Sequence, residues 1–84
     1  MEIKLTIPEY PAKGLGYEWE NGFEIKTGIS GGEIMISANK AGLISLAKQM
    51  LTLAQDTVPV GYHMHFDEYN SLAEESVGLI IEKR

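Results

Sequence analysis

Residues 39–55 read NKAGLISLAKQMLTLAQ, and this stretch decides the fold because it holds the one long helical pattern of the chain. Asn39 is a favoured helix N-cap, since its side chain can accept hydrogen bonds from the first free backbone amides. Apolar residues then recur at helical spacing and predict a helix over Lys40–Gln55. The predicted apolar stripe consists of Leu43, Ala47, Met50, Leu51 and Ala54, widened by Ile44, Leu46 and Leu53.

Shorter segments on both sides of this helix alternate polar and apolar residues, as half-buried strands do. The predicted strands are Glu2–Ile7, Phe23–Thr27, Glu33–Ser37, Gly61–Asp67 and Ser76–Glu82. A long loop over Glu9–Gly22 can hold a short strand through Tyr17 and Trp19. The sequence therefore predicts an α+β fold, with one α-helix packed on one face of a mainly antiparallel sheet of four to five strands. The other face of such a sheet is partly open to solvent or to a partner.

The length and composition limit what the chain can be. With 84 residues, we expect a single small domain over residues 1–84. A domain of this size has a thin core, so an enclosed active-site cavity would be hard to fit. There are no cysteines, which excludes disulfides and thiolate chemistry and fits a reducing cytoplasm. No signal pattern and no membrane-spanning apolar run is present, so we expect a cytoplasmic protein without membrane association.

The charge balance bears on the partner. The net charge is −5, the six lysines are scattered, and Arg84 is the only arginine. Nucleic acid is therefore a poor partner, because binding a phosphate backbone needs clustered basic residues. A basic protein fits better, since charge complementarity speeds encounter. The acidity can also serve solubility alone.

The most distinctive motif is His63-x-His65-x-Asp67. On a strand, residues two apart point to the same side, so the three side chains would form one row. Zinc accepts histidine and carboxylate ligands, but a complete site would need further carboxylates such as Glu68 or Glu74. The same pattern also describes a polar strand face, a partner-contact face, or histidines held by structural hydrogen bonds. These alternatives remain open from the sequence.

No catalytic or cofactor motif is complete. Gly14-Leu15-Gly16 lacks the third glycine of a dinucleotide-binding loop. Glu74 and Glu75 are neighbours in a predicted turn and would point apart, whereas acid–base pairs face each other across a cleft. We therefore expect no catalytic residues, no metal and no cofactor.

Aromatic residues in the loops are candidate interface anchors. Trp19 and Tyr69 lie outside the alternating apolar positions. For Trp19 the alternative is that the ring folds back and covers one end of the core.

Four segments together resemble one known family. They read GYEWENG (residues 16–22), ISANKAGLISLA (36–47), GYHMHFD (61–67) and SVGLIIE (76–82). They resemble the bacterial immunity proteins of polymorphic toxin systems, of the immunity protein 32 type. This resemblance implies an α+β protein that binds a cognate toxin in the cytoplasm of the producing cell. The tryptophan of the family pattern corresponds to Trp19, and the histidine-strand motif to His63, His65 and Asp67.

Taken together, the resemblance and the residues predict an immunity protein that neutralises a cognate toxin by occlusion, without catalysis. The predicted partner-binding residues are His63, His65, Asp67, Glu68, Tyr69 and Trp19. Two alternatives belong to other classes: a small metal-binding protein that uses the His63/His65/Asp67 strand, and a module that self-associates, as a homodimer, through an exposed edge strand.

Overall fold

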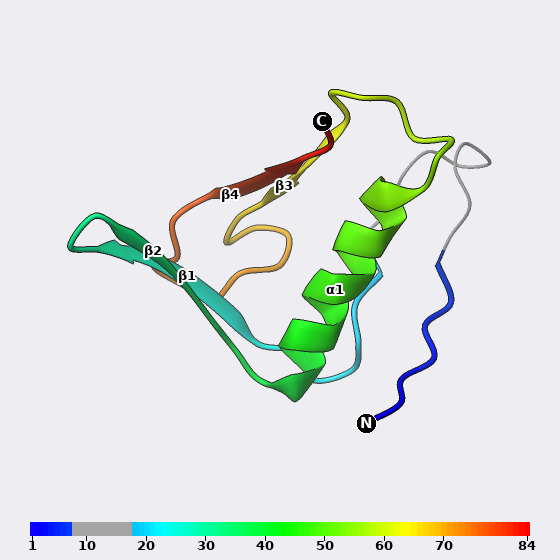
Figure 1. The fold of residues 1–84 in the computed structure, drawn as a ribbon. Coiled ribbons are helices and arrows are strands. Elements are labelled where there is room, and N and C mark those ends of the chain that lie inside the picture. Colours follow the sequence, from blue (N-terminus) through cyan, green and yellow to red (C-terminus); the bar gives the residue numbers. More distant parts are fainter. Residues whose placement is uncertain (8–17) are drawn as a thin grey trace.

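The computed structural model describes residues 1–7 and 18–84, and its elements make an α+β fold as predicted (Figure 1). A first hairpin consists of β1 (Ile25–Ser30) and β2 (Glu33–Ala38), the helix α1 covers Lys40–Ala54, and a second hairpin consists of β3 (His63–Phe66) and β4 (Leu79–Glu82). The first hairpin projects away from α1. In the view of Figure 1, β3 and β4 lie beside each other above the base of this hairpin.

The predicted single sheet of four to five strands is wrong, because the strands form two separate two-stranded antiparallel sheets. The segment before β4, and not β4 itself, runs beside β1. There the Ala73 N–H donates to the Ile25 carbonyl (2.8 Å) and the Val77 N–H donates to the Thr27 carbonyl (3.3 Å). These bonds hold a loop against β1 without extending into a ladder, so the two hairpins do not merge.

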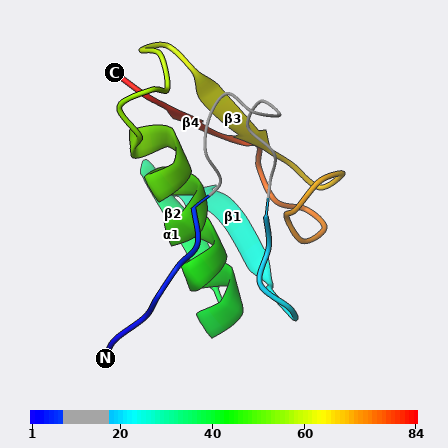
Figure 2. The same ribbon diagram turned by 90° about the vertical axis from the view of Figure 1, so that its right-hand side faces the viewer.

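The predicted strand Glu2–Ile7 is also wrong. Residues 1–7 form no strand, and they run beside α1 on the side away from both hairpins (Figures 1 and 2). Trp19, in the predicted short strand, is not in a strand either. Residues 8–17, which contain most of the predicted loop and Tyr17, lie outside the described residues.

The start of α1 is fixed as the sequence predicts. The Asn39 side-chain oxygen accepts from the Gly42 N–H at 2.8 Å, so Asn39 is the N-cap. The same oxygen accepts from the Glu24 N–H at 3.0 Å, which ties the helix start to the chain entering β1. Gly42 is needed here, because a Cβ on it would lie 2.4 Å from the Glu24 carbonyl oxygen. At the other end, the Lys83 ammonium donates to the Gln55 carbonyl at 2.6 Å and stabilises the helix C-terminus.

The predicted core-facing stripe of α1 is wrong, since the helix is turned so that much of this stripe is exposed. Leu43, Met50 and Leu51 are about half exposed, at 55%, 47% and 48%. The buried positions are Gly42, Ser45, Leu46, Gln49, Thr52 and Leu53.

Polar groups explain this orientation of α1. The Glu20 N–H donates to the Ser45 hydroxyl at 2.7 Å, and the Gln49 amide donates to the Glu18 carbonyl. Lys48 also forms an ion pair with Glu18, at 3.0 Å. Ser45 and Gln49 are thus satisfied by the segment that precedes β1, and the helix can bury them at little cost.

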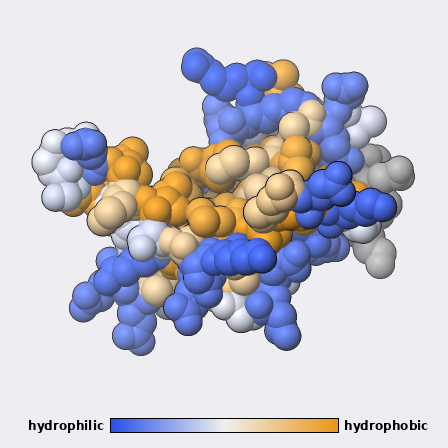
Figure 3. Space-filling view, turned by 60° about the horizontal axis from the view of Figure 1, so that its bottom comes forward, coloured by the Kyte–Doolittle hydropathy of each residue, from blue (hydrophilic) through white to orange (hydrophobic). Residues whose placement is uncertain are grey.

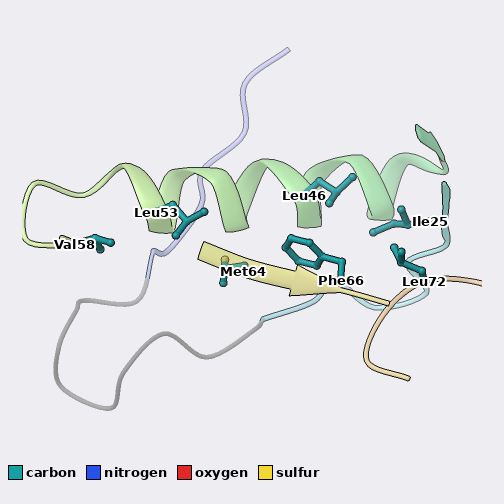
Figure 4. Packing of buried hydrophobic residues seen from close by; sticks show 7 residues of the cluster. All are labelled: Ile25, Leu46, Leu53, Val58, Met64, Phe66 and Leu72. Carbon is teal, nitrogen blue, oxygen red and sulfur yellow. The ribbon is translucent and has the colours of Figure 1, made fainter. Parts of the chain in front are cut away.

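The core lies between α1, β3 and the base of β1 (Figure 4). Leu46 and Leu53 of the helix face Met64 and Phe66 of β3. The buried apolar cluster comprises Ile25, Leu46, Leu53, Val58, Met64, Phe66 and Leu72. It is small, as expected for a chain of this length.

Candidate functional site

The histidine row is created by the alternation of β3. Met64 and Phe66 are buried in the core, at 2% and 1% exposure. Because successive side chains of a strand point to opposite sides, His63 and His65 point outward. The two imidazole rings meet edge to face, with centroids 4.8 Å apart. The His63 Nδ1 lies 3.1 Å from the Gly61 carbonyl oxygen, which orients this ring. The predicted outward-facing histidine pair is present in the structure.

The neighbouring strand adds two residues to the outward side of β3 that carries His63 and His65, which we call the histidine face. In the β3–β4 register, Glu82 lies opposite His63 and Ile80 lies opposite His65. Opposite residues of an antiparallel pair share one face of the sheet. Both are exposed, Ile80 at 57%. The face therefore combines two imidazoles, a carboxylate and an exposed apolar side chain.

Asp67 leaves the row and organises the turn that follows β3. Its Oδ1 accepts from the backbone N–H of Tyr69 at 2.9 Å and from that of Asn70 at 3.1 Å. In return the Asn70 side chain accepts from the Asp67 N–H at 3.0 Å and donates to the His65 carbonyl at 2.8 Å. These bonds define an Asx-type turn and fix it to the end of β3.

Tyr69 stands at the tip of this turn and is 97% exposed. An aromatic ring held so far in water adds almost nothing to the core, but it offers a large contact area to a partner. Glu68 beside it accepts from the Glu75 N–H with its Oε2 at 3.0 Å. Glu75 has a positive φ of 68°, in the left-handed region that residues with a Cβ rarely adopt. We call residues 67–75 the tyrosine loop.

The tyrosine loop is anchored to the body of the protein on its inner side. Leu72 is buried in the core at 5% exposure. Ala73 donates to β1 as described above, and further along the Thr27 hydroxyl donates to the Val77 carbonyl at 2.5 Å. The loop therefore presents Tyr69 from a base fixed by apolar packing and by hydrogen bonds.

The charge of this part of the chain is uniformly acidic. Residues 63–82 contain five carboxylates and no lysine or arginine; the carboxylates are Asp67, Glu68, Glu74, Glu75 and Glu82. A concentration of one sign of charge attracts a partner of the opposite sign and speeds their association.

Trp19 lies apart from the histidine face and belongs to the packing at one end of the core. Its ring stacks on Phe23, with centroids 4.7 Å apart, and meets the edge of Phe66 at 5.9 Å. Phe66 points to the buried side of β3, opposite to His63 and His65. Of the predicted binding residues, the structure thus brings together His63, His65, Asp67, Glu68 and Tyr69, and it places Trp19 elsewhere.

The residues that could hold a metal are few. Within residues 1–7 and 18–84, no group of three or more histidine, aspartate or glutamate side chains has the geometry to bind one ion. The carboxylate of Asp67 is directed to backbone amides of its own turn. His63 and His65 are a pair without a third ligand in this part of the chain, whereas structural zinc sites use four ligands.

Sequence reasoning missed several residues of the site. Ile80 and Glu82 join it only through the β3–β4 register, which no local pattern specifies. Asn70 could have been found, because Asp and Asn three residues apart after a strand are typical of Asx turns.

One comparison with known proteins identifies a family. Residues 33–84, more than half of the chain, match the model of a family described as immunity protein 32. This match starts at β2 and includes α1, the histidine face and the tyrosine loop. No curated protein and no solved structure matches the chain. In the part of the chain that the structure describes, no helix has the length and apolar character needed to cross a membrane.

Proposed function

The chain belongs to the immunity protein 32 family, and on that premise we propose that it binds a cognate bacterial toxin and neutralises it by occlusion. It acts without catalysis, in the cytoplasm of the producing cell. The contact surface is formed by the histidine face of β3 and by the tyrosine loop. This proposal keeps His63, His65, Asp67, Glu68 and Tyr69 as the binding region and assigns them different tasks.

The main support for the proposed contact surface is that Tyr69 is exposed on a loop whose backbone is held by hydrogen bonds. Tyrosine is enriched among the residues that dominate binding energy at interfaces, because it buries a large rigid surface for little loss of entropy. The bonds of Asp67 and Glu68 hold the backbone of this loop before any partner arrives. A preformed loop loses less conformational freedom on binding, which favours affinity.

The acidic groups around Tyr69 favour a toxin whose contact surface is basic. Glu74 and Glu75 are exposed, and they lie on the loop that presents the ring. Many toxins that act on nucleic acid must carry basic residues, because binding phosphate requires them. An acidic protein that covers such residues would block the approach of the substrate without any chemical step. Asp67 and Glu68 contribute mainly by shaping the loop.

The histidine face extends the contact beyond the loop. His63 and His65 present their imidazole rings on the exposed side of β3, and Ile80, opposite His65, adds exposed apolar area beside them. A specific interface typically covers about 800 Å² on each partner. The face and the loop together are continuous along the chain from β3 to Glu75, which suits a single contact of this kind.

The experiment that tests the proposed function is a growth rescue. The toxin gene encoded beside this one is expressed in a sensitive host, with and without this protein, and the two proteins are then co-purified. We expect restored growth and a stable complex. A folded protein that neither restores growth nor co-purifies with the toxin would contradict the proposal.

A control separates occlusion from chemistry. Purified toxin is incubated with this protein, the complex is dissociated, and the toxin is assayed again. Occlusion predicts that the recovered toxin is fully active and has an unchanged mass. A toxin that stays inactive, or that is covalently altered, would show that the protein acts by catalysis.

A further inference from the structure

The outer edge of β2 has no strand beside it in the described part of the chain. β2 pairs with β1 on one side, and the other edge of β1 is occupied by the loop through Ala73 and Val77. No backbone hydrogen bond from the described residues reaches the outer edge of β2. A two-stranded hairpin is marginally stable by itself in water. A free edge of this kind is a template for pairing with another strand.

The same strand exposes apolar side chains on both of its faces. Ile34 and Met35, which point to opposite faces, are 71% and 60% exposed, and Ile36 is 39% exposed. Ile29 of β1 lies opposite Ile34 and is 66% exposed. Figure 3 shows hydrophobic side chains in a band that runs from the projecting hairpin across this face of the molecule, with hydrophilic residues above and below. A shallow hollow follows the strand, lined by Ser30, Glu33, Ile34, Met35 and Ile36.

We propose that the outer edge of β2 pairs antiparallel with the β2 edge of a second copy of this chain, with the two-fold axis at Met35. This inference does not rest on the proposed function. A two-fold axis perpendicular to a sheet places each residue opposite one on the same face. The axis must therefore run between one residue and the same residue of the second copy. With Met35 on the axis, the result is a continuous four-stranded sheet, β1–β2 of one copy followed by β2–β1 of the other.

This register matches apolar residues with one another. Met35 lies opposite Met35 of the partner subunit, and Ile34 lies opposite Ile36 of the partner subunit. Because Ile29 is already opposite Ile34 within each hairpin, the isoleucines of both copies become neighbours on one face of the sheet. Side chains that lie opposite each other on neighbouring strands stabilise a sheet through their contact.

The register also keeps the negative charges of the two acidic chains apart where they meet. Glu33 is the only charged residue of β2, and it lies opposite Ser37 of the partner subunit. The two Glu33 residues are four positions apart along the pairing, about 14 Å, which exceeds a screening length of about 8 Å. Lys26 lies opposite Ser37 within its own hairpin, so it shares a row and a face with Glu33 of the partner subunit. A toxin offering one strand to this edge would not explain this self-complementarity, and so we favour a second copy.

The test is the mass of the full chain in solution, measured by light scattering over a dilution series. We expect the wild-type chain to show twice the mass of the monomer at high concentration and to dissociate on dilution. Met35→Lys places two like charges on the axis and should give a monomer with an unchanged circular-dichroism spectrum. Met50→Lys makes the same change on the exposed side of α1 and should leave the dimer intact. A monomeric wild-type chain, or a Met35→Lys dimer, would overturn the proposal.

Cross-linking tests the register, because the chain has no cysteine of its own. Under oxidising conditions, Met35→Cys should form a covalent dimer, since the two sulfurs meet at the axis. Glu33→Cys is the matched control on the same face of the same strand, and the proposed register keeps its two sulfurs too far apart to bond. Efficient cross-linking of Glu33→Cys without that of Met35→Cys would refute this register.

Discussion

The carboxylate of Glu68 accepts a hydrogen bond from the backbone N–H of Glu75, with 3.0 Å between Oε2 and N. This bond joins the two ends of the tyrosine loop, seven residues apart. It also supports the backbone where Glu75 takes a positive φ. Between these two residues, the loop presents Tyr69 to solvent and sends Leu72 into the core. Glu68 therefore shapes the proposed contact surface as well as charging it.

Replacing Glu75 by glycine should stabilise the protein. A residue with a Cβ loses about 1–2 kcal/mol in the left-handed region, and the added flexibility of glycine offsets about 0.5–1 kcal/mol of this. The bond to Glu68 uses the backbone and survives the change. We expect Glu75→Gly to raise the free energy of unfolding by about 0.5–1 kcal/mol in urea denaturation. Glu74→Gly, at a residue without positive φ, should lower it; equal losses in both variants would contradict the assigned backbone.

Gly42→Ala should destabilise the protein although it lies in a helix. Helix propensity alone predicts a gain of about 1 kcal/mol from this change. The new methyl group, however, would lie 2.4 Å from the Glu24 carbonyl oxygen and 3.0 Å from Ile25. Overpacking of this kind costs about 1–3 kcal/mol, so we expect a net loss in thermal or urea denaturation.

The control for this change is Gly28→Ala, where nothing lies within 4 Å of the added Cβ. That variant should be neutral or slightly stabilising. If Gly42→Ala were the more stable of the two, α1 would not pack as closely on β1 as the structure shows.

The orientation of α1 predicts opposite outcomes for two leucines. Leu46 is 4% exposed and Leu43 is 55% exposed. Leu46→Ala should lower the free energy of unfolding by about 2–5 kcal/mol, while Leu43→Ala should lower it by about 1 kcal/mol or less. Urea denaturation of both variants checks this. If Leu43→Ala cost more than Leu46→Ala, the helix would bury the apolar stripe that the sequence periodicity predicts, in contradiction to the structure.

Zinc should leave the stability of the protein unchanged. Within residues 1–7 and 18–84, no three histidine or carboxylate side chains are grouped so that they could hold one ion. Asp67 already accepts two backbone hydrogen bonds. We expect the same melting temperature with zinc and with a chelator. A melting temperature that rises with zinc in the wild type, and fails to rise in His65→Ala, would support the metal-binding alternative instead.

Local patterns predicted the helix and four of the five expected strands, but not the absence of a strand at Glu2–Ile7. The helix, its Asn39 cap and the outward histidines of β3 depend on neighbouring residues alone, and the structure confirms them. The assembly of these elements could not be predicted in the same way. Whether β1 pairs with β4 or with a loop depends on contacts about fifty residues apart in the chain, which no local alternation specifies.

The face of α1 was mispredicted for a physical reason. Periodicity assumes that polar residues face water, but Ser45 and Gln49 are buried because the backbone at Glu18 and Glu20 satisfies them. The candidate site shows the same division. His63, His65 and Tyr69 were recognisable from the sequence, whereas the shaping role of Asp67 and the neighbours on β4 emerge only from the folded chain.

The proposed contact surface is tested most directly by a calorimetric titration of the cognate toxin with Tyr69→Ala and with Val60→Ala. Both residues are exposed, at 97% and 75%, and neither contributes to the core. If the tyrosine loop is the contact surface, Tyr69→Ala should lose about 2 kcal/mol of binding free energy, roughly a thirtyfold increase in Kd. Val60→Ala should bind like the wild type. A Tyr69→Ala protein that binds the toxin as tightly as the wild type would contradict the proposed surface.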